Sequence, residues 1–507
     1  MSQQAITYLG DFINGSFQPV TKAEGEILSL SPADTKDMVM KLAFQNDHID
    51  IACQAARKAY LPWARRPLEE RKQLLKKLKD VFNAHVDEMA MIIARDTGKP
   101  LWEAKTEAQA LGSKIDITVD YSIKLVQDEH LPNALPGVEG VTRFKPRGVM
   151  AVLGPFNFPA HLPNGHIIPA LLMGNTVVFK PSEQTPAVGQ FYARMFEKAE
   201  FPPGVFNMVQ GIGETGRKLV LHEEVDGILF TGSYEVGLRI KQETLTHYWK
   251  IHALEMGGKN ATIIWEDADM DKAVYETVVG AFMTSGQRCA CTSRVFVHEK
   301  LADEFTERFY QAAKRLSIGH WSENPFMGPL INEGAVEKYL RFQEIAKREN
   351  CESLMRGKAL DLKWKGHYVT PSINLVNKFD ANSVYQKTEI FGPNVAIHRV
   401  NDFDQTMMAV NSTGFGLVAA LFTKNKALYE KALLECKVGL LNWNRTTNGA
   451  SSKLPFGGMG KSGNDRASAH FAIQYCSVPV ASLEDPTDFD ASKVLPGMNY
   501  PVGGSSQ

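Results

Sequence analysis

The sequence predicts an α/β fold with two parallel β-sheets, each covered by helices on both faces. From residue 148 onward, short apolar runs typical of buried strands alternate with longer runs of helical periodicity. This alternation specifies parallel sheets, because each connecting helix packs on a face of the sheet. The alternation resumes after residue 260, and a chain of 507 residues is long enough for two or more domains.

The N-terminal part precedes this alternation. Residues up to about 47 are typical of short strands, with Asn14-Gly15 as a hairpin turn, and a helical pattern follows from 49 to 124. The tail from Asp485 is rich in Pro, Gly, Asp and Ser, which predicts an extended arm. The main strands are expected at 149–153, 175–179, 206–209, 227–230, 261–265 and 294–298, and the helices between and after them at 163–173, 187–199, 214–221, from 234, 301–316 and 334–348.

Composition is that of a soluble globular protein, with 44% hydrophobic residues, 22% charged residues and a net charge of −1. No basic stripe favours nucleic acid, and no polybasic cluster favours a membrane surface. No run of about 18 apolar residues could span a bilayer. The six cysteines are scattered and no signal peptide is visible, so we expect a cytoplasmic protein.

The stretch Thr284-Ser-Gly-Gln-Arg-Cys-Ala-Cys291 joins an expected helix, ending at Gly286, to an expected strand. Cys289 is therefore on a tight connection where its thiol can face a cleft. A helix C-terminus disfavours a thiolate, so a catalytic Cys289 needs a base, a cation or a cofactor nearby; a buried structural cysteine is the alternative. His298 is the only candidate third ligand near this C-x-C pair, so no metal site is expected.

Two strand-to-helix junctions are candidates for binding a dinucleotide phosphate. Gly211-Ile-Gly-Glu-Thr-Gly216 matches the G-x-G-x-x-G fingerprint between a strand and a helix. It follows the third strand of its unit, however, and the acidic residue expected after the next strand is missing. Phe230-Thr-Gly-Ser233 offers a hydroxyl and backbone N–H groups, including those at Gly232 and Ser233. Ser233 is also a good N-cap, and both roles can coexist.

Four further polar residues are candidates, and three of them, Lys180, Glu183 and Asn157, follow expected strands. Lys180 and Glu183 suit the hydroxyls of a ribose, and Glu183 would repel a 2′-phosphate; a surface ion pair is the alternative. Glu255 lies between apolar neighbours before two glycines, so a raised pKa would make it a base near neutral pH. Asn157, fixed between two prolines, presents an amide donor for an oxyanion. A helix cap and a plain turn are the alternatives for Glu255 and Asn157.

Taken in order, these stretches resemble the NAD(P)-dependent aldehyde dehydrogenase superfamily. Any one signature is weakly specific, but seven in family order across nearly the whole chain are highly specific. The seven are Phe156-Asn-Phe-Pro159, Lys180-Pro-Ser-Glu183, Phe230-Thr-Gly-Ser233, Leu254-Glu-Met-Gly-Gly-Lys259, Gly286-Gln-Arg-Cys289, Glu389-Ile-Phe-Gly-Pro393 and Pro455-Phe-Gly-Gly458.

The resemblance implies a role for each candidate. Cys289 would be the nucleophile and Glu255 the general base, and Asn157 with the Cys289 backbone N–H would form the oxyanion hole. The thiolate attacks an aldehyde, a hydride passes to NAD, and Glu255 activates water to release a free acid. The implied NAD-binding residues are Lys180 and Glu183 at the adenosine ribose, Gly232 and Ser233 at the second junction, and Glu389 and Phe391 at the nicotinamide end.

The resemblance also divides the chain into an NAD-binding domain (1–126 and 147–254), a catalytic domain (255–465), and a small oligomerisation β-sheet with a C-terminal arm (127–146 and 466–507). It implies a homodimer or homotetramer that acts on a small-molecule aldehyde.

Within the superfamily, the chain is most similar to a subgroup that oxidises a semialdehyde with two or more carboxylates. His166 supports this similarity, because most members of the superfamily carry lysine at that position and histidine matches this subgroup. The expected anion anchor is the loop 445–452, although a plain polar loop is an equal alternative. Rival functions are oxidation of glutamate 5-semialdehyde or another ω-semialdehyde acid, a non-enzymatic binding protein, and a C-x-C redox or metal protein. The expected substrate-binding residues are Arg445, Gly449, Ala450 and Ser451.

Overall fold

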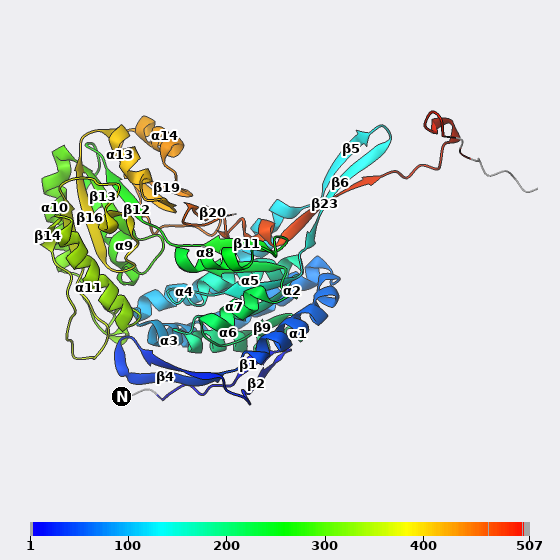
Figure 1. Cartoon of the computed structure of the whole chain (residues 1–507), viewed down its shortest axis with the longest axis horizontal. Coiled ribbons are helices and arrows are strands. Elements are labelled where there is room, and N and C mark those ends of the chain that lie inside the picture. Colours follow the sequence, from blue (N-terminus) through cyan, green and yellow to red (C-terminus); the bar gives the residue numbers. More distant parts are fainter. Residues whose placement is uncertain (1–3, 465, 499, 501–507) are drawn as a thin grey trace, which may run out of the picture.

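The computed structural model describes residues 4–464, 466–498 and 500. The predicted domain boundary at residue 465 and residues 501–507 of the predicted arm lie outside the described residues. Two lobes, each built on a seven-stranded sheet, face one another, and a narrow sheet projects from one lobe (Figure 1). The predicted α/β fold with parallel sheets covered by helices is confirmed.

The first sheet has the order β11-β10-β7-β8-β9-β1-β2. Its first five strands are parallel, and the β1–β2 hairpin adds an antiparallel edge. Asn14 and Gly15 turn this hairpin with φ values of 53° and 88°, as a tight hairpin turn requires. The strands are β1 (Asp11–Ile13), β2 (Ser16–Gln18), β7 (Val149–Leu153), β8 (Thr176–Lys180), β9 (Phe206–Met208), β10 (Gly227–Thr231) and β11 (Ile251–Glu255).

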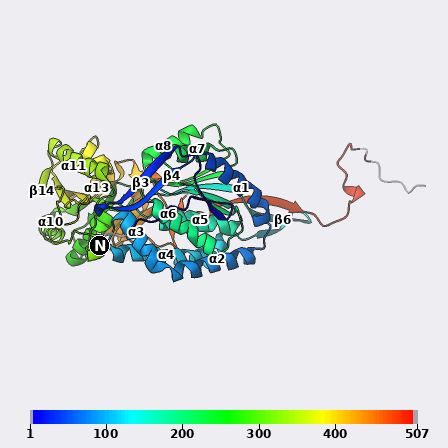
Figure 2. The same ribbon diagram turned by 90° about the horizontal axis from the view of Figure 1, so that it is seen from below.

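Helices cover both faces of this sheet. They are α1 (Asp47–Ala64), α2 (Leu68–Ala84), α3 (Val86–Thr97), α4 (Leu101–Asp116), α5 (His161–Met173), α6 (Pro186–Lys198), α7 (Gly213–Leu221) and α8 (Tyr234–Glu243). From below, Figure 2 shows the hairpin of β3 (Gly25–Ser31) and β4 (Asp34–Phe44) lying across α3 and α6. Asp96 of α3 ties these parts together, because it accepts hydrogen bonds from the Ser29 hydroxyl at 2.8 Å and from the Val188 backbone at 3.1 Å.

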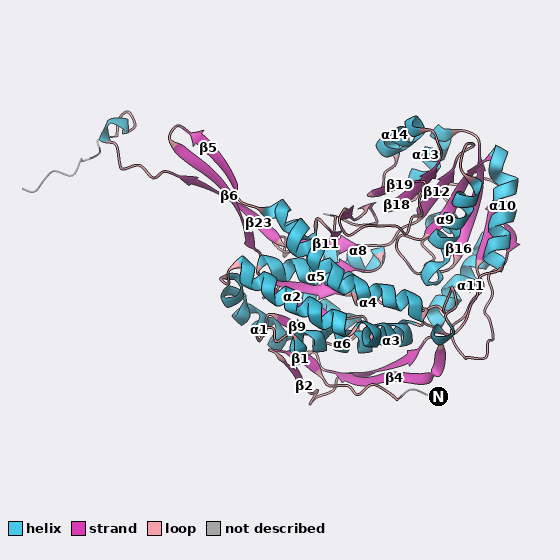
Figure 3. Ribbon diagram, turned by 180° about the vertical axis from the view of Figure 1, so that it is seen from behind, coloured by secondary structure: helices cyan, strands magenta, loops and turns pink. Residues whose placement is uncertain are grey.

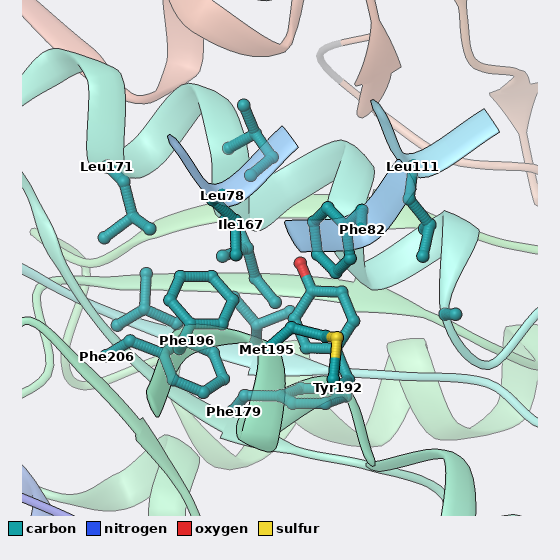
Figure 4. Close-up of a cluster of buried hydrophobic side chains, with 14 of the residues drawn as sticks. Leu78, Phe82, Leu111, Ile167, Leu171, Phe179, Tyr192, Met195, Phe196 and Phe206 are labelled. Atoms are coloured by element: carbon teal, nitrogen blue, oxygen red, sulfur yellow. The ribbon is translucent and has the colours of Figure 1, made fainter. Parts of the chain in front are cut away.

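The core of this lobe lies between α2, α4, α5, α6 and the sheet (Figure 4). Phe196 and Phe206 stack with ring centroids 3.9 Å apart, and both are almost fully buried. Leu111 anchors α4 in the same core. Burying one such side chain contributes roughly 1.5–3 kcal/mol, so α4 is held as a rigid element beside the sheet.

The second sheet has the order β14-β15-β16-β13-β12-β18-β19. Only the β14–β15 pair is antiparallel. Its strands are β12 (Asn260–Ile264), β13 (Thr292–His298), β14 (Glu352–Met355), β15 (Ser372–Val376), β16 (Asn394–Val400), β18 (Val418–Phe422) and β19 (Leu440–Trp443). Its helices are α9 (Met270–Phe282), α10 (Glu299–Lys314), α11 (Glu333–Arg348), α12 (Val384–Lys387), α13 (Phe403–Asn411) and α14 (Lys426–Glu435).

The projecting sheet joins two segments far apart in the sequence. β5 (Glu129–Leu135), β6 (Val138–Pro146) and β23 (Ser477–Glu484) form an antiparallel sheet in the order β23-β6-β5, which reaches away from both lobes (Figure 3). Among the described residues, no helix has the length and apolar character needed to cross a membrane. Further short elements are β17 (Phe415–Gly416), β20 (Pro455–Phe456), β21 (Met459–Gly460), β22 (Ser468–Ala469), α15 (Ala472–Tyr475), one π-helical turn (Ile117–Tyr121) and 3₁₀ turns at Ser122–Val126, Trp321–Glu323 and Ala491–Lys493.

Candidate active site

A cavity of about 1350 Å³ lies at the carboxyl ends of the first sheet. Leu153, Lys180, Thr231 and Glu255, the last residues of β7, β8, β10 and β11, all line it, and Cys289 lines it from the second lobe. Parallel sheets bind ligands at this edge. The nine residues predicted for catalysis and cofactor binding all line this one cavity: Asn157, Lys180, Glu183, Gly232, Ser233, Glu255, Cys289, Glu389 and Phe391.

The turn that carries Cys289 differs from the predicted one. The helix was expected to end at Gly286, but α9 ends at Phe282 and a 3₁₀ turn follows. Thr284 and Ser285 both have a φ of 54°, a left-handed conformation that costs energy outside glycine. A Cβ on Gly286 would lie 2.3 Å from the Gly392 carbonyl oxygen. Close contacts between backbones therefore fix the turn before Cys289.

The surroundings of Cys289 disfavour its thiolate. Burial, followed by the nearby carboxylates of Glu255 and Glu389, raises the pKa of the Cys289 thiol well above its usual value. Asn260 holds the backbone here, donating to the Cys289 carbonyl at 2.6 Å and to the Cys291 carbonyl at 2.9 Å. Both cysteines are free thiols. The expected need for a base, a cation or a cofactor therefore holds, but burial and the two carboxylates create it rather than a helix C-terminus.

Glu255 has the environment of a latent base. It ends a strand rather than capping a helix, so the helix-cap alternative is wrong. Neither carboxylate oxygen has a hydrogen-bond partner among the described residues. Burial raises its pKa well above the usual value, and Arg466 offsets this only in part. A carboxyl group in such a site can take a proton from water near neutral or alkaline pH.

Asn157 presents its side-chain amide to the cavity from the loop after β7. Its Nδ2 donates one hydrogen bond to the Gln287 carbonyl at 2.9 Å, and an amide nitrogen carries two protons. The Asn157 carbonyl in turn accepts a hydrogen bond from Lys99 Nζ at 2.6 Å. The second Nδ2 proton can therefore donate a hydrogen bond to an oxyanion. Asn157 is well placed for this role, because both its backbone and its side chain are held by hydrogen bonds.

The predicted cofactor residues form a site that fits a dinucleotide. Glu183 and Glu389 provide two carboxylates that can accept hydrogen bonds from ribose hydroxyls. Lys180 Nζ lies 3.5 Å from Glu183. Ser233 caps α8 by accepting from the Val236 N–H at 3.3 Å, and the remaining N–H groups of that first turn favour a phosphate.

Two residues shape the other part of the cofactor cavity. Glu389 accepts a hydrogen bond from the Gly258 backbone at 2.8 Å, and burial raises its pKa to about 7 despite that bond. A Cβ on Gly257 would lie 1.9 Å from the Glu389 carboxylate, so any larger residue there would displace that carboxylate. Phe391 has a φ of 59° and meets the Phe156 ring edge to face, with ring centroids 5.8 Å apart.

The predicted substrate loop lies elsewhere. Arg445, Gly449, Ala450 and Ser451 are exposed and do not line the cavity. The loop is attached behind Cys291, since the Thr447 and Thr292 hydroxyls lie 2.9 Å apart and Asn448 donates to the Gly280 carbonyl at 2.9 Å. The anion-anchoring role of this loop stays a prediction.

His166 lies behind the wall of the cavity. Its Nδ1 is 2.7 Å from the Tyr475 hydroxyl and its Nε2 is 3.2 Å from the Thr231 hydroxyl. Burial lowers its pKa to about 3, so the imidazole is neutral. Thr231 pairs in register with Glu255 on the next strand, which places His166 one side chain away from the strand end that carries the base.

Sequence reasoning missed four charged residues that support the site, namely Lys99, Glu103, Glu107 and Arg288. Glu103 and Glu107 are almost fully buried on α4. The only signal was a pair of acids four residues apart in a helix, and such pairs are usually exposed.

Comparisons with known proteins agree with this geometry. The sequence model described as "Aldehyde dehydrogenase family" matches residues 20–479. The chain is 39% identical over 495 residues to N-succinylglutamate 5-semialdehyde dehydrogenase of Serratia proteamaculans (strain 568), covering 96% of this chain and 99% of that protein. It is 40% identical over 501 residues to the protein of the same name in Legionella pneumophila (strain Corby), covering 98% and 99%.

Solved structures are also similar. A 1-pyrroline-5-carboxylate dehydrogenase from Thermus with bound NAD superposes with a TM-score of 0.89 at 30% identity, over 95% of this chain and 93% of that one. An NAD-dependent aldehyde dehydrogenase from Sinorhizobium meliloti superposes with a TM-score of 0.91 at 26% identity, over 96% of each chain.

Proposed function

We propose that this chain, which belongs to the aldehyde dehydrogenase family, oxidises N-succinyl-L-glutamate 5-semialdehyde to N-succinyl-L-glutamate, a step of arginine catabolism. Its cofactor is NAD. The observation that carries the proposed mechanism is the meeting of Cys289, Glu255 and Asn157 in one cavity with six residues suited to a dinucleotide. The relatives that share this substrate name align with nearly the whole chain, which supports the choice of substrate.

The proposed reaction starts at Cys289. Its thiolate attacks the aldehyde carbon, and the Asn157 amide with the Cys289 backbone N–H stabilises the oxyanion of the hemithioacetal. NAD, when bound, accepts the hydride that leaves this carbon, and a thioester on Cys289 results. Glu255 then takes a proton from water, the hydroxide attacks the thioester, and the acid leaves while the thiolate is restored.

Glu183 supports the choice of NAD over NADP. Its side chain is 40% exposed in the cavity beside Lys180, where it can accept ribose hydroxyls. A 2′-phosphate at the same place would meet a like charge. Glu255 also favours a free acid as the product. Hydrolysis of the thioester needs a base that activates water, whereas transfer of the acyl group to coenzyme A does not.

Glutamate 5-semialdehyde is the second candidate substrate. The superposition on 1-pyrroline-5-carboxylate dehydrogenase favours it. The two candidates differ in the second carboxylate, which the succinyl group supplies and which the loop 445–452 would hold through Arg445 and nearby backbone N–H groups. Preference for the succinylated compound therefore depends on that loop.

We also propose that the chain works as a cytoplasmic homodimer or homotetramer through the projecting sheet. The segments that form β5, β6 and β23 are those predicted to mediate oligomerisation, and β5 is exposed along most of its length. The proposed division into an NAD-binding domain (1–126 and 147–254) and a catalytic domain (255–465) assigns one large sheet to each, except that Glu255, the last residue of β11 in the first sheet, falls in the catalytic domain.

The test is steady-state NADH formation with the two semialdehydes in parallel and with NAD or NADP as acceptor. The proposal expects kcat/KM to be much higher for N-succinylglutamate 5-semialdehyde with NAD. Equal or higher kcat/KM for glutamate 5-semialdehyde would reject the proposed substrate and leave the aldehyde chemistry intact.

A further inference from the structure

We propose that Glu103 and Glu107 of α4 are positioning residues that set the distance between Asn157 and Cys289. The inference rests on the proposed roles of those two residues, because the oxyanion hole needs the Asn157 amide and the Cys289 thiol in a fixed relation. Asn157 belongs to the first lobe and Cys289 to the second, and α4 contacts the loops that carry both.

Glu107 holds the Asn157 loop. Its Oε1 accepts hydrogen bonds from the backbone N–H groups of Ala160 at 3.0 Å and His161 at 3.1 Å, where α5 begins. Its Oε2 binds Lys99 Nζ at 2.7 Å, and the same ammonium donates to the Asn157 carbonyl at 2.6 Å. One carboxylate thus fixes the chain at the Asn157 carbonyl, through Lys99, and again at Ala160 and His161.

Glu103 holds the turn before Cys289. Its Oε1 accepts hydrogen bonds from Arg288 Nη2 at 2.7 Å and from the Thr284 hydroxyl. Arg288 Nε also donates to that hydroxyl at 2.6 Å, which closes a ring of contacts around the left-handed turn. Burial alone would raise the pKa of Glu103, but Arg288 and Lys99 outweigh it and hold the pKa below its usual value, so the anchor is a carboxylate.

The two anchored loops meet at a ring. Phe158 directly follows Asn157, and Arg288 directly precedes Cys289. The Phe158 ring has Lys99 Nζ 3.9 Å from its centroid and Arg288 Cζ 4.8 Å from it. Both cations are therefore held twice, once by an acid on α4 and once by the ring next to the oxyanion donor.

α4 is suited to serve as a common support. Glu103 and Glu107 are four residues apart, so they lie on one face of the helix about 6 Å from each other. Ala104, Ala108 and Leu111 of the same helix are at most 1% exposed and pack in the core of the first lobe. Because α4 cannot shift without disturbing that core, it transmits a fixed spacing to both loops.

Stability alone is a poor explanation for this arrangement. Buried ion pairs contribute little net stability compared with apolar side chains of the same volume. What the two buried acids and their cation partners do provide is direction, because their bonds fix particular groups beside the reacting residues. Glu107 and Lys99 hold backbone groups around Asn157, and Glu103 holds the side chains of Thr284 and Arg288 before Cys289. A positioning role predicts a defect confined to reactions that form an oxyanion, whereas a stability role predicts a uniform loss.

The experiment compares two reactions of Cys289 in full-length Glu103→Gln. Single-turnover acylation by 4-nitrophenyl acetate passes through a tetrahedral oxyanion, and the thiolate displaces nitrophenolate. Alkylation by iodoacetamide displaces iodide and forms no oxyanion. We expect the acylation rate to fall about 10- to 100-fold, as displacement of a catalytic group by about 1 Å can cost, while alkylation stays near the wild-type rate.

Asp37→Asn is the matched control. Asp37 binds Arg95 at 2.6 Å in another buried ion pair, which joins β4 to α3, and neither residue lines the cavity. It should lower the melting temperature and leave both rates unchanged. If Glu103→Gln fails to fold, Arg288→Met removes the same link without leaving a cation unpaired, and it should show the same selective loss of acylation.

Three results would overturn the proposal: unchanged acylation in Glu103→Gln and Arg288→Met, an equal fall in both reactions, or the same selective loss in Asp37→Asn. A Cys289→Ala protein separates this failure from failure of the proposed catalytic assignment. If Cys289→Ala is acylated and turns over aldehyde as fast as wild type, then Cys289 is not the nucleophile. If it is inactive while Glu103→Gln acylates normally, only the positioning role is rejected.

Discussion

Replacing Glu255 by Gln should separate the two halves of the reaction. The two side chains have the same shape, and the carboxylate has no hydrogen-bond partner to lose among the described residues. The substitution breaks no hydrogen bond among these residues and removes a carboxyl group that burial makes costly to ionise, so it should not lower the free energy of unfolding. Its effect on catalysis can then be assigned to the loss of the base.

The size of that effect follows from the role. A positioned general base contributes about 10²- to 10⁴-fold, which corresponds to roughly 2.7–5.5 kcal/mol of activation free energy. The loss should fall on hydrolysis of the thioester, because Glu255 is proposed to act on water. Hydride transfer precedes that step, so it should continue in the variant until every Cys289 is acylated.

Stopped-flow absorbance of NADH measures both steps. We expect Glu255→Gln to show a burst approaching one NADH for each active site, followed by slow steady turnover. The wild-type protein is the control. In it the thioester on Cys289 should not accumulate, because its hydrolysis keeps pace with hydride transfer. Loss of the burst together with turnover would show that Glu255 is needed to form the thioester, and unchanged steady turnover would show that it is not the base. Either result would refute the reasoning.

Three further predictions test other parts of the site. Asn157→Ala should lower kcat about 100- to 1000-fold, the usual cost of one oxyanion donor, and leave the KM for NAD unchanged; a loss in KM alone would contradict the assignment. Since burial raises the pKa values of both Cys289 and Glu255, and each acts only after losing a proton, kcat/KM should rise with pH above neutrality; a fall over that range would contradict this. Glu183→Gln should lower the KM for NADP about tenfold, because a nearby like charge costs roughly 1 kcal/mol or more, and an unchanged ratio of KM values for NADP and NAD would exclude Glu183 as the discriminating group.

The main elements could be predicted because buried parallel strands are continuous apolar runs. The strand expected at 149–153 is β7 without any change of bounds, and the helix expected at 334–348 is α11 beginning one residue earlier. Residues at the ends of such strands converge for a topological reason. This is why Lys180 and Asn157, which follow expected strands, could be placed at one edge of the sheet. The strand that ends at Glu255 was not predicted, and Glu255 was assigned to the site through the family resemblance.

The turn before Cys289 could not be predicted in the same way. Gly286 looks like an ordinary helix C-terminus, and the helix was expected to end there. The left-handed conformations of Thr284 and Ser285 are imposed by contacts with residues distant in the sequence, such as Glu103 of α4. No local preference of threonine or serine indicates such a backbone.

The support from α4 was missed for a related reason. Glu103 and Glu107 have the spacing of exposed acids on a surface helix, and only tertiary packing buries them against Lys99 and Arg288. The reverse holds for Arg445, whose charge suggested an anion anchor but whose side chain is exposed away from the cavity lining. Charge and spacing identify candidate residues, and the fold decides which of them meet.

The most direct test of the proposed mechanism is the identity of the covalent intermediate. Glu255→Gln protein should be incubated with NAD and N-succinylglutamate 5-semialdehyde, quenched in acid, digested, and examined by peptide mass spectrometry. We expect the N-succinylglutamyl group as a thioester on Cys289, with Cys291 unmodified in the same peptide. An acyl group on Cys291, or no acyl adduct after NADH has formed, would contradict it.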